Sequence, residues 1–356
     1  MPALFLYCRA GFEAECAAEI QSLAQHHDVS GYCQTTSQSG YVLFHATDLA
    51  SLQFLHANLP FAEVIFARQW FIALAQLKDM PVTDRITPLL AALHALPSAA
   101  NEVFFETPDT NEGKELAALC RSIATPFTKQ ATANGILKAT QLSPYRLHLC
   151  FLPGAQAFAG YALSNNSAPW PMGIPRLKAS RDAPSRSALK LEEAWLRFLT
   201  PQEQALSLQP GMRAVDLGAA PGGWTAELVK RHIHVIAVDN GNIDPKLLES
   251  GLVEHVRGDG FRYRPKKNVD WMVCDIVEQP IRIAELAALW LSGDLCRFCI
   301  FNLKLPMKKR YHEVQRCLDR VRESLVQSGL ECQIRAKQLY HDREEVTVYV
   351  STRSHG

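Results

Sequence analysis

One glycine-rich segment of the sequence could hold a nucleotide-derived cofactor. Residues 215–224 read VDLGAAPGGW and lie where an apolar strand should turn into a helix, the place at which doubly wound folds bind nucleotides. A dinucleotide fingerprint has the form GxGxxG, but Ala220 replaces its second glycine and Pro221 lacks a backbone N–H donor. The loop is therefore poorly suited to a pyrophosphate. Its backbone could still approach a different ligand at the glycines, Gly218, Gly222 and Gly223.

Carboxylates at the ends of successive predicted strands favour S-adenosylmethionine as that ligand. Asp216 closes the strand before the loop, where it would repel a pyrophosphate but could orient the methionine ammonium through charge-assisted hydrogen bonds. Asp239 closes the next strand, about 20 residues downstream, where an acidic side chain meets ribose hydroxyls. Asp259 follows a third strand and could accept a hydrogen bond from the adenine amino group. Each aspartate alone could equally be a turn or cap residue, so the prediction depends on their succession.

Two residues at the ends of later strands could take part in methyl transfer. Asp275 ends the predicted strand DWMVCDI and Lys304 ends RFCIFNLK, so both should lie at the same edge of the sheet. Transfer from a sulfonium to a hydroxyl requires alignment of the acceptor and removal of its proton. Lys304 is our candidate for the base. If it keeps its own proton, it could instead stabilise the developing alkoxide.

The protonation state of Lys304 depends on its neighbours. A lysine titrates at about 10.4 in water; desolvation or a nearby cation lowers that pKa, and nearby carboxylates raise it. Lys190 could supply the cation, although the apolar stripe of its predicted helix places Lys190 on the exposed face. Asp275 and a carboxylate from the pair Glu344 and Glu345 would raise the pKa, and strand register favours Glu345 of the two. The sequence leaves open which effect wins.

The order of predicted elements differs between the two halves of the chain. The first half carries no chemical motif and mixes strands at 3–9, 40–46, 103–107 and a hairpin at 145–163 with helices at 12–25, 86–96 and 115–127. After residue 186, strands mostly followed by helices predict an α/β fold with a doubly wound, mostly parallel sheet. Those strands are expected at 214–218, 234–240, 253–258, 270–276, 297–304, 331–336 and 345–350.

Composition limits how the chain could bind its partners. With 356 residues and 47% hydrophobic content, the chain can form two domains joined by a linker, for which we take the segment 164–185 with its four prolines. The net charge of +1 gives no global attraction to nucleic acid, so RNA affinity would depend on local basic patches. Three are present: Arg176, Lys178, Arg181 and Arg186; Arg257, Arg262, Arg264, Lys266 and Lys267; and Lys304, Lys308, Lys309 and Arg310.

The sequence predicts neither a membrane protein nor a metalloprotein. There is no run of about 18 apolar residues and no signal-peptide pattern at the start, so we expect a cytoplasmic protein with no membrane contact. Ten irregularly spaced cysteines are typical of reduced core thiols. Cys296 and Cys299 form a single CxxC pair without nearby histidines, so no metal is expected. No protein partner is evident, and we expect a monomer.

Several of these segments together resemble a known family. Residues 185–191, the loop, Asp275, Lys304 and Glu345 are similar to the cofactor loop and Lys-Asp-Lys-Glu tetrad of the FtsJ/RrmJ ribose 2′-O-methyltransferases. The block FNLKLPMKKRY at 301–311 is similar to that of the bacterial ribosomal RNA large subunit methyltransferase M (RlmM) family. This second resemblance spans nearly the whole chain. It implies S-adenosylmethionine-dependent 2′-O-methylation of a cytidine in the peptidyl-transferase region of 23S rRNA.

The resemblance also implies roles for residues and domains. The implied tetrad is Lys190, Asp275, Lys304 and Glu345. The implied cofactor contacts are Ser187, Ala220, Pro221, Gly222, Gly223, Asp239, Asp259 and Asp275, to which the loop argument adds Asp216 and Gly218. The implied domains are a ferredoxin-like lobe at 1–58, a THUMP RNA-binding domain at 59–163, the linker at 164–185 and a Rossmann-like class I methyltransferase domain at 186–356.

Three other functions compete with this interpretation. An RNA base methyltransferase acting on an amino group would carry Asn/Asp-Pro-Pro-aromatic after the fourth strand, whereas Asp275 is followed by IVEQP. Cytosine C5 methylation would need a nucleophilic cysteine, and Cys274 lies in an apolar strand. A non-catalytic RNA-binding or ribosome-assembly factor is opposed by the presence of all four tetrad residue types. An NAD-dependent oxidoreductase is disfavoured by Ala220 and Pro221.

Overall fold

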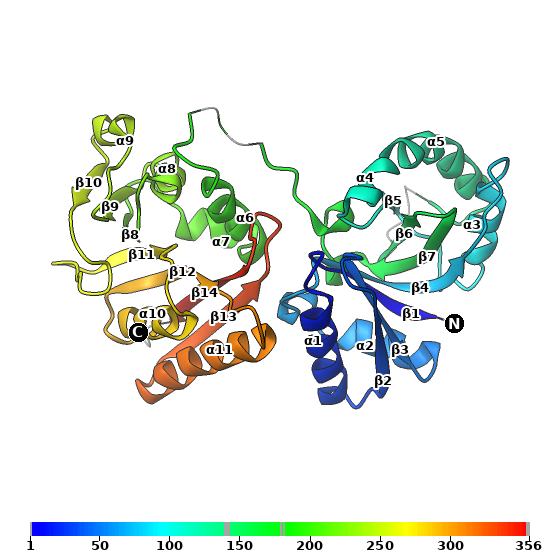
Figure 1. Cartoon of the computed structure of the whole chain (residues 1–356), viewed down its shortest axis with the longest axis horizontal. Coiled ribbons are helices and arrows are strands. Elements are labelled where there is room, and N and C mark those ends of the chain that lie inside the picture. Colours follow the sequence, from blue (N-terminus) through cyan, green and yellow to red (C-terminus); the bar gives the residue numbers. More distant parts are fainter. Residues whose placement is uncertain (1, 139–142, 179, 181, 354–356) are drawn as a thin grey trace. The chain divides into compact units, whose positions relative to one another are not determined.

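The computed structural model describes residues 2–138, 143–178, 180 and 182–353. The chain forms two compact units, Met1–Ile174 and Pro175–Gly356, and each is built around its own sheet (Figure 1). The boundary between them falls inside the proline-rich segment 164–185. Residues 179 and 181 of that segment, including Arg181 of the first basic patch, lie outside the described residues. The finer division into four parts stays a prediction.

The first unit contains a single seven-stranded sheet with the strand order β2-β3-β1-β4-β7-β6-β5. Its elements are β1 (Ala3–Tyr7), α1 (Glu13–His26), β2 (Gly31–Thr35), β3 (Tyr41–Ala46), α2 (Leu49–Asn58), η1 (Phe61–Glu63), β4 (Gln69–Leu77), α3 (Ile86–Ala92), β5 (Glu102–Glu106), α4 (Asn111–Glu115), α5 (Ala117–Ala133), β6 (Tyr145–Leu152), β7 (Gln156–Leu163), η2 (Ser164–Asn166) and η3 (Pro171–Gly173). The mixture of antiparallel strands and helices confirms the predicted α+β region.

Strand β4, which the sequence does not predict, joins the two parts of this sheet. It pairs with β1 on one side and with β7 on the other. Its sequence, QWFIALAQL, is a mostly apolar run that fits a buried strand or a buried helix equally well. The strand also anchors the start of the predicted linker, because Gln69 Nε2 donates to the carbonyls of Ala168 at 2.8 Å and Trp170 at 3.2 Å.

The second unit confirms the predicted doubly wound, Rossmann-like fold. Its elements are α6 (Ala188–Phe198), α7 (Pro201–Ser207), β8 (Arg213–Leu217), α8 (Gly223–Val229), β9 (His234–Val238), α9 (Pro245–Glu249), β10 (Val253–Val256), β11 (Val269–Cys274), α10 (Pro280–Ser292), β12 (Cys296–Lys304), α11 (Arg310–Gln327), β13 (Glu331–Lys337) and β14 (Glu345–Arg353). The strand order is β10-β9-β8-β11-β12-β14-β13. The first five strands in this order are parallel, and β14 runs antiparallel to both of its neighbours.

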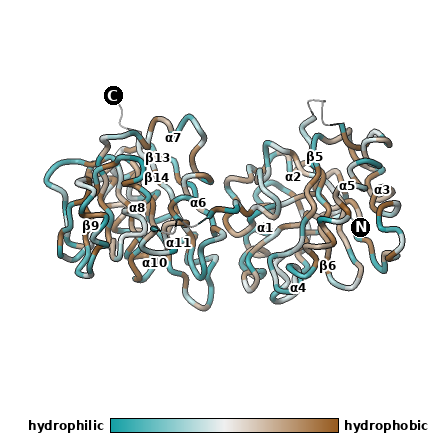
Figure 2. The backbone as a smooth tube through the Cα atoms, turned by 90° about the horizontal axis from the view of Figure 1, so that it is seen from above, coloured by the Kyte–Doolittle hydropathy of each residue, from teal (hydrophilic) through white to brown (hydrophobic). Residues whose placement is uncertain are grey.

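Helices cover both faces of this sheet. Trp195 and Phe198 of α6 pack with Trp271, Ile300 and Tyr349 of the strands in one buried cluster. Helices α10 and α11 pack against each other on the opposite face (Figure 1). Hydrophobic segments follow the strands of both units, and hydrophilic segments lie mainly in loops (Figure 2). Within the described residues, no helix combines the length and apolar character needed to cross a membrane.

Candidate active site

The predicted reacting residues meet at the carboxyl edge of the second sheet. Asp275 follows β11, and Lys304 is the last residue of the neighbouring parallel strand β12. Glu345 begins β14, which runs in the opposite direction, so its first residue lies beside the last residue of β12. Lys304 and Glu345 are directly paired in the register. The parallel and antiparallel neighbours of β12 therefore bring both carboxylates to one lysine.

The four charged groups form an alternating cluster. The Nζ atom of Lys304 donates to Asp275 Oδ1 and to Glu345 Oε2. The Nζ atom of Lys190 donates to Glu345 Oε1 and lies 3.5 Å from Asp275 Oδ2. Two ammonium groups and two carboxylates thus balance one another. Glu344 instead forms an ion pair with Arg310 at 2.8 Å, away from the lysines.

The expectation that Lys190 is a solvated surface residue is wrong. Only 15% of its side chain is exposed, compared with 21% for Lys304. Helix α6 carries its apolar stripe against the sheet, but its first turn also contacts β14. Lys190 lies at the margin of that stripe, where its amine reaches Glu345. Periodicity identifies the buried face of a helix and does not reveal a charged partner beyond the margin of that face.

The structure settles the direction of the shift in the pKa of Lys304. Burial opposes the ammonium form and is the largest single effect. The attraction of Asp275 and Glu345, together with their hydrogen bonds to the amine, outweighs burial, so the pKa of Lys304 is raised above its ordinary value. At neutral pH the amine is therefore protonated in the absence of other ligands.

The glycine-rich loop after β8 has the backbone geometry of a close-approach loop. Gly218 and Gly222 adopt φ angles of 76° and 114°, which residues with a side chain rarely adopt. A Cβ atom on Gly223 would lie 2.3 Å from the hydroxyl oxygens of both Ser185 and Ser187. The loop is thus packed against the residues that precede α6. Ser187 also accepts a hydrogen bond at its carbonyl from Trp224 Nε1, at 3.0 Å.

Asp239 is attached to the same loop. Its Oδ2 accepts the N–H of Ala220 at 3.0 Å, and its Oδ1 accepts the N–H of Gly241 at 2.7 Å. The carboxylate is partly exposed and keeps further lone pairs for a ligand. Pro221, the next residue after Ala220, offers no N–H. Asp239 and the loop therefore form one continuous polar surface.

Asp216 and Asp259 differ in their surroundings. Asp216 is buried and accepts the hydroxyl of Thr225 at 2.7 Å. Burial raises the pKa of Asp216 to about 7, and the nearby carboxylates of Asp275 and Asp239 act in the same direction. Asp259 is exposed, accepts the N–H of Phe261 at 2.9 Å and lies 3.6 Å from Arg262. It shapes its own loop, and its predicted contact with adenine stays a prediction.

The sequence analysis missed three polar residues behind the charged cluster. Asn302 donates to Asp275 Oδ1 at 2.8 Å. The hydroxyl of Thr347 bonds the amide oxygen of Asn302 and also contacts the carboxyl group of Asp342. Asn302 precedes Lys304 by two residues and Thr347 follows Glu345 by two residues, so they share a face of the sheet with the tetrad. The alternation of side chains along these strands is the signal that could have found Asn302 and Thr347, whereas Asp342 lies in the turn before β14.

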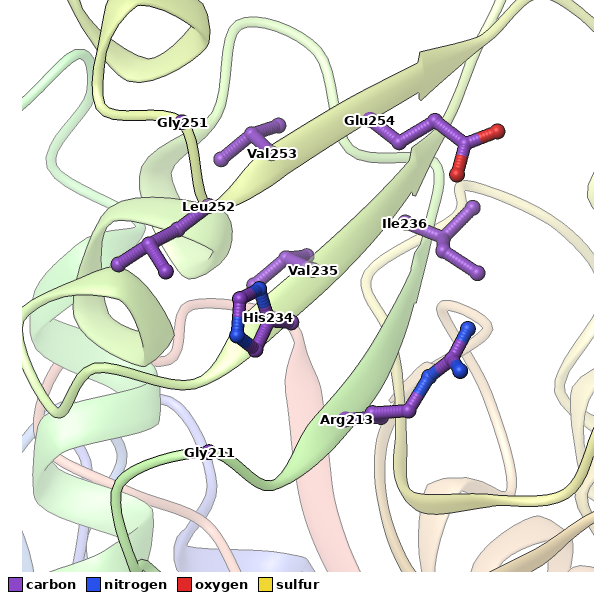
Figure 3. A pocket seen from close by; sticks show the side chains of 9 residues that line it. All are labelled: Gly211, Arg213, His234, Val235, Ile236, Gly251, Leu252, Val253 and Glu254. Atoms are coloured by element: carbon purple, nitrogen blue, oxygen red, sulfur yellow. The ribbon is translucent and has the colours of Figure 1, made fainter.

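A separate hollow of about 420 Å³ lies at the opposite edge of the same sheet. It is lined by the first residues of β8 and β9, Arg213 and His234, and by the start of β10 (Figure 3). Parallel strands place their two ends at opposite edges, so this hollow is not part of the site that contains Lys304.

The fold and the site define a class I S-adenosylmethionine-dependent methyltransferase. A model of the FtsJ-like methyltransferase matches residues 183–314. Models of the RlmM ferredoxin-like domain and of the N-terminal part of ribosomal RNA large subunit methyltransferase M match residues 1–71 and 84–163. The chain belongs to the ribosomal RNA large subunit methyltransferase M family, and its cofactor is S-adenosylmethionine.

Curated relatives match along their whole length. Ribosomal RNA large subunit methyltransferase M of Cellvibrio japonicus is 52% identical over 98% of this chain and 99% of its own. The protein of the same name from Methylococcus capsulatus is 53% identical over 98% of this chain and 97% of its own. The similarity therefore includes both units.

Proposed function

We propose that this enzyme methylates ribosomal RNA at a ribose 2′-hydroxyl, on a cytidine in the peptidyl-transferase region of 23S rRNA. The observation that carries the proposal is the meeting of Lys190, Asp275, Lys304 and Glu345 at the carboxyl edge of the sheet. Such a cluster suits an alcohol acceptor, which needs a positioned group to take its proton. The choice of rRNA rests on family membership.

The chain's own residues perform positioning and proton removal in this proposal. S-adenosylmethionine supplies a methyl group on a sulfonium. Asp275 and Glu345 hold the amine of Lys304 from two sides, so this amine can meet a hydroxyl in a fixed direction. The minor deprotonated form of Lys304, with a free lone pair on Nζ, takes the hydroxyl proton. Lys190, paired with Glu345, keeps one positive charge beside the two carboxylates when Lys304 is deprotonated.

The loop after β8 and the acidic residues beside it fit the cofactor. S-adenosylmethionine carries an ammonium, a sulfonium and a ribose, for which carboxylates are suitable partners. Asp216 is assigned to the ammonium, Asp239 to the ribose and Asp259 to adenine. Backbone groups of Gly218 to Gly223 and the hydroxyl of Ser187 complete the surface, and Asp275 borders both the cofactor and the acceptor. A Cβ on Gly218 or Gly222 would lie 2.5 Å from the side chain of Ile276 or Leu247, so only glycine allows the loop to pack in this conformation.

Two exposed apolar residues at the rim of the site support an RNA substrate. Val277 and Met307 are 84% and 91% exposed, the highest values among large hydrophobic side chains in the described part of the chain. They lie in the loops that directly follow Asp275 and Lys304. Lys308 and Lys309, both exposed, come next along the chain. Apolar surface beside cations suits an unstacked base with its phosphates.

The competing base-methylation function loses its nucleophile in this structure. Cys274 is buried in β11, and burial raises the pKa of its thiol to about 12. A thiol with that pKa is almost entirely protonated at neutral pH and cannot attack a pyrimidine ring. Attack at cytosine C5 would require a thiolate, so the geometry favours the ribose hydroxyl as acceptor.

The experiment that tests the proposal is methylation of protein-free 23S rRNA. The RNA is taken from a strain that lacks this gene and incubated with the enzyme and methyl-labelled S-adenosylmethionine, and the label is mapped. We expect the label in one alkali-resistant dinucleotide. The variant Lys304→Ala should lose methyl transfer and keep its cofactor affinity, whereas Lys230→Ala, at the residue after α8, should behave as wild type. Label on a base, or no label at all, would contradict the proposal.

A further inference from the structure

Three buried polar side chains form a chain of hydrogen bonds behind the tetrad. Asn302 of β12 and Thr347 of β14 are directly paired, two residues from the Lys304 and Glu345 pair. Asp342 lies in the turn that leads into β14. All three are almost fully buried, with Asn302 and Thr347 at 0% and Asp342 at 1% exposure. Buried polar groups of this kind must satisfy one another's hydrogen bonds.

The direction of each hydrogen bond follows from the one before it. Asn302 Nδ2 lies 2.8 Å from Asp275 Oδ1, and Lys304 donates to the same oxygen. A carboxylate oxygen held by an ammonium can only accept, so the amide nitrogen of Asn302 must face it. The amide oxygen of Asn302 therefore faces Thr347 Oγ1, at 2.7 Å. Since an amide oxygen only accepts, Thr347 must donate its hydroxyl hydrogen there.

This leaves Thr347 without a hydrogen for Asp342. The Oγ1 atom of Thr347 lies 3.2 Å from Asp342 Oδ1 and 3.0 Å from Oδ2. The Oδ2 atom also accepts the N–H of Leu339 at 2.9 Å. An ionised Asp342 would present only acceptors to an oxygen that has already donated its single hydrogen. The contact is attractive only if Asp342 carries a proton and donates it to Thr347.

The charge balance of the site leads to the same protonation state. Lys190 and Lys304 already balance Asp275 and Glu345. An ionised Asp342 would place a further buried negative charge beside Glu345 and Glu193, which repel it. Burial, followed by the repulsion of Glu345, raises the pKa of Asp342 well above its ordinary value; Glu193 adds to this, while Lys190 and the N–H of Leu339 oppose it.

We infer that Asp342 is a neutral carboxylic acid that positions the tetrad. It donates to Thr347, Thr347 donates to Asn302, and Asn302 donates to Asp275, which holds the amine of Lys304. Asp342 is a positioning residue, because it acts on Lys304 only through this chain. The protonation of Asp342 follows from the hydrogen-bond geometry and the surrounding charges and does not depend on the proposed function, whereas its catalytic consequence rests on that function.

The protonation state can be measured in the full-length enzyme without any substrate. A difference infrared spectrum between wild type and Asp342→Asn is recorded at pH 7 and pH 8, with and without carbon-13 aspartate labelling. We expect the wild type to show a protonated-carboxyl stretch that shifts with the label and is absent from the variant. Asp216 is present in both proteins, so its signal cancels. A carboxylate band in place of the protonated band would overturn the inference.

The positioning role is tested by variants that separate the hydrogen bond donated by residue 342 from the charge of that residue. An asparagine at 342 still donates to Thr347 and accepts from Leu339, so Asp342→Asn should retain most of the activity that Asp342→Leu loses. Thr347→Val removes the link and should lower kcat about tenfold or more, because the tetrad is less well aligned. The KM for S-adenosylmethionine should not change, and Thr347→Ser should restore kcat.

The outcomes distinguish this inference from the proposed function. If Asp342→Asn lost as much activity as Asp342→Leu, Asp342 would act by its charge and the inference would be wrong. If Asp342→Leu failed to fold, Thr347→Val and Thr347→Ser would still decide the question. If the wild type methylated no RNA, the proposed function would fail, and the infrared measurement would still test the protonation of Asp342.

Discussion

Asp216 has 1% of its surface exposed, and burial raises the pKa of its carboxyl from 3.8 to about 7. Repulsion by Asp275 and Asp239 adds to the shift, while the hydroxyl of Thr225 opposes it. The folded protein therefore binds this proton more tightly than the unfolded chain does. The resulting stabilisation is fully present below pH ~4 and is lost as the pH rises through about 7.

This linkage predicts that Asp216→Asn stabilises the enzyme at alkaline pH. The amide cannot ionise, so the variant avoids the burial of a charge, and the gain should reach at most about 4 kcal/mol. The Tm of wild type and variant, compared at pH 4 and pH 8.5, should be close at the lower pH and diverge at the higher one. Asp319→Asn, at an exposed ion pair on α11, is the control. A gap in Tm that did not grow with pH would contradict the assignment.

The raised pKa of Lys304 makes its proposed role as a base depend on pH. Only the minor deprotonated form can take a proton, so the single-turnover rate should rise about tenfold per pH unit between pH 6 and pH 9. The variant Lys304→Arg should be inactive, since a guanidinium keeps its proton. These rates are measured at saturating cofactor. A flat profile together with an active arginine variant would assign Lys304 to electrostatic stabilisation instead.

At the scale of elements, strand ends were the most predictable part of the site. Parallel strands end at one edge, so Asp216, Asp239, Asp275 and Lys304 could be placed at a common edge from the sequence. Glu345 could be placed only weakly, because its position depends on the register of β14 against β12. A register shift of one residue would have brought Glu344 to the lysine instead.

The sequence could not predict contacts that depend on how elements pack. Lys190 reaches the site because α6 contacts β14 and its amine bonds Glu345, a contact that helical periodicity does not encode. Asp342 lies in a turn, where an aspartate ordinarily caps backbone groups in water. Its burial follows from the packing around it. Strand β4 was missed for a similar reason, since its apolar sequence fits two kinds of element.

The loops after β11 and β12 should contact the RNA through their exposed apolar side chains. We expect Met307→Ala to lower kcat/KM for rRNA about tenfold, since full burial of a methionine side chain contributes about 1.5–3 kcal/mol. The Kd for S-adenosylmethionine should not change. Val326→Ala is the matched control, because Val326 is 65% exposed at the other end of α11. Equal kcat/KM values for the two variants would exclude Met307 from the RNA interface.

At the scale of the whole molecule, the enzyme has no excess charge with which to attract RNA. A net charge of +1 over 356 residues gives little long-range attraction, so binding must combine local cations with shape. Around the proposed base these cations are Lys308 and Lys309, since Arg310 is already paired with Glu344. Local contacts of this kind supply only part of the affinity for RNA, so the remainder must come from another part of the chain. We assign that role to the first unit.

The two units can be separated to test this assignment. Each has its own sheet and its own buried cluster, so a fragment of residues 175–356 should fold cooperatively. Because all the proposed cofactor contacts lie in the second unit, its Kd for S-adenosylmethionine should stay within about threefold of the full chain. Calorimetry measures this Kd, and methylation of 23S rRNA by the same fragment should fall below detection. If the fragment methylated 23S rRNA as efficiently as the full chain, substrate capture would lie in the second unit alone.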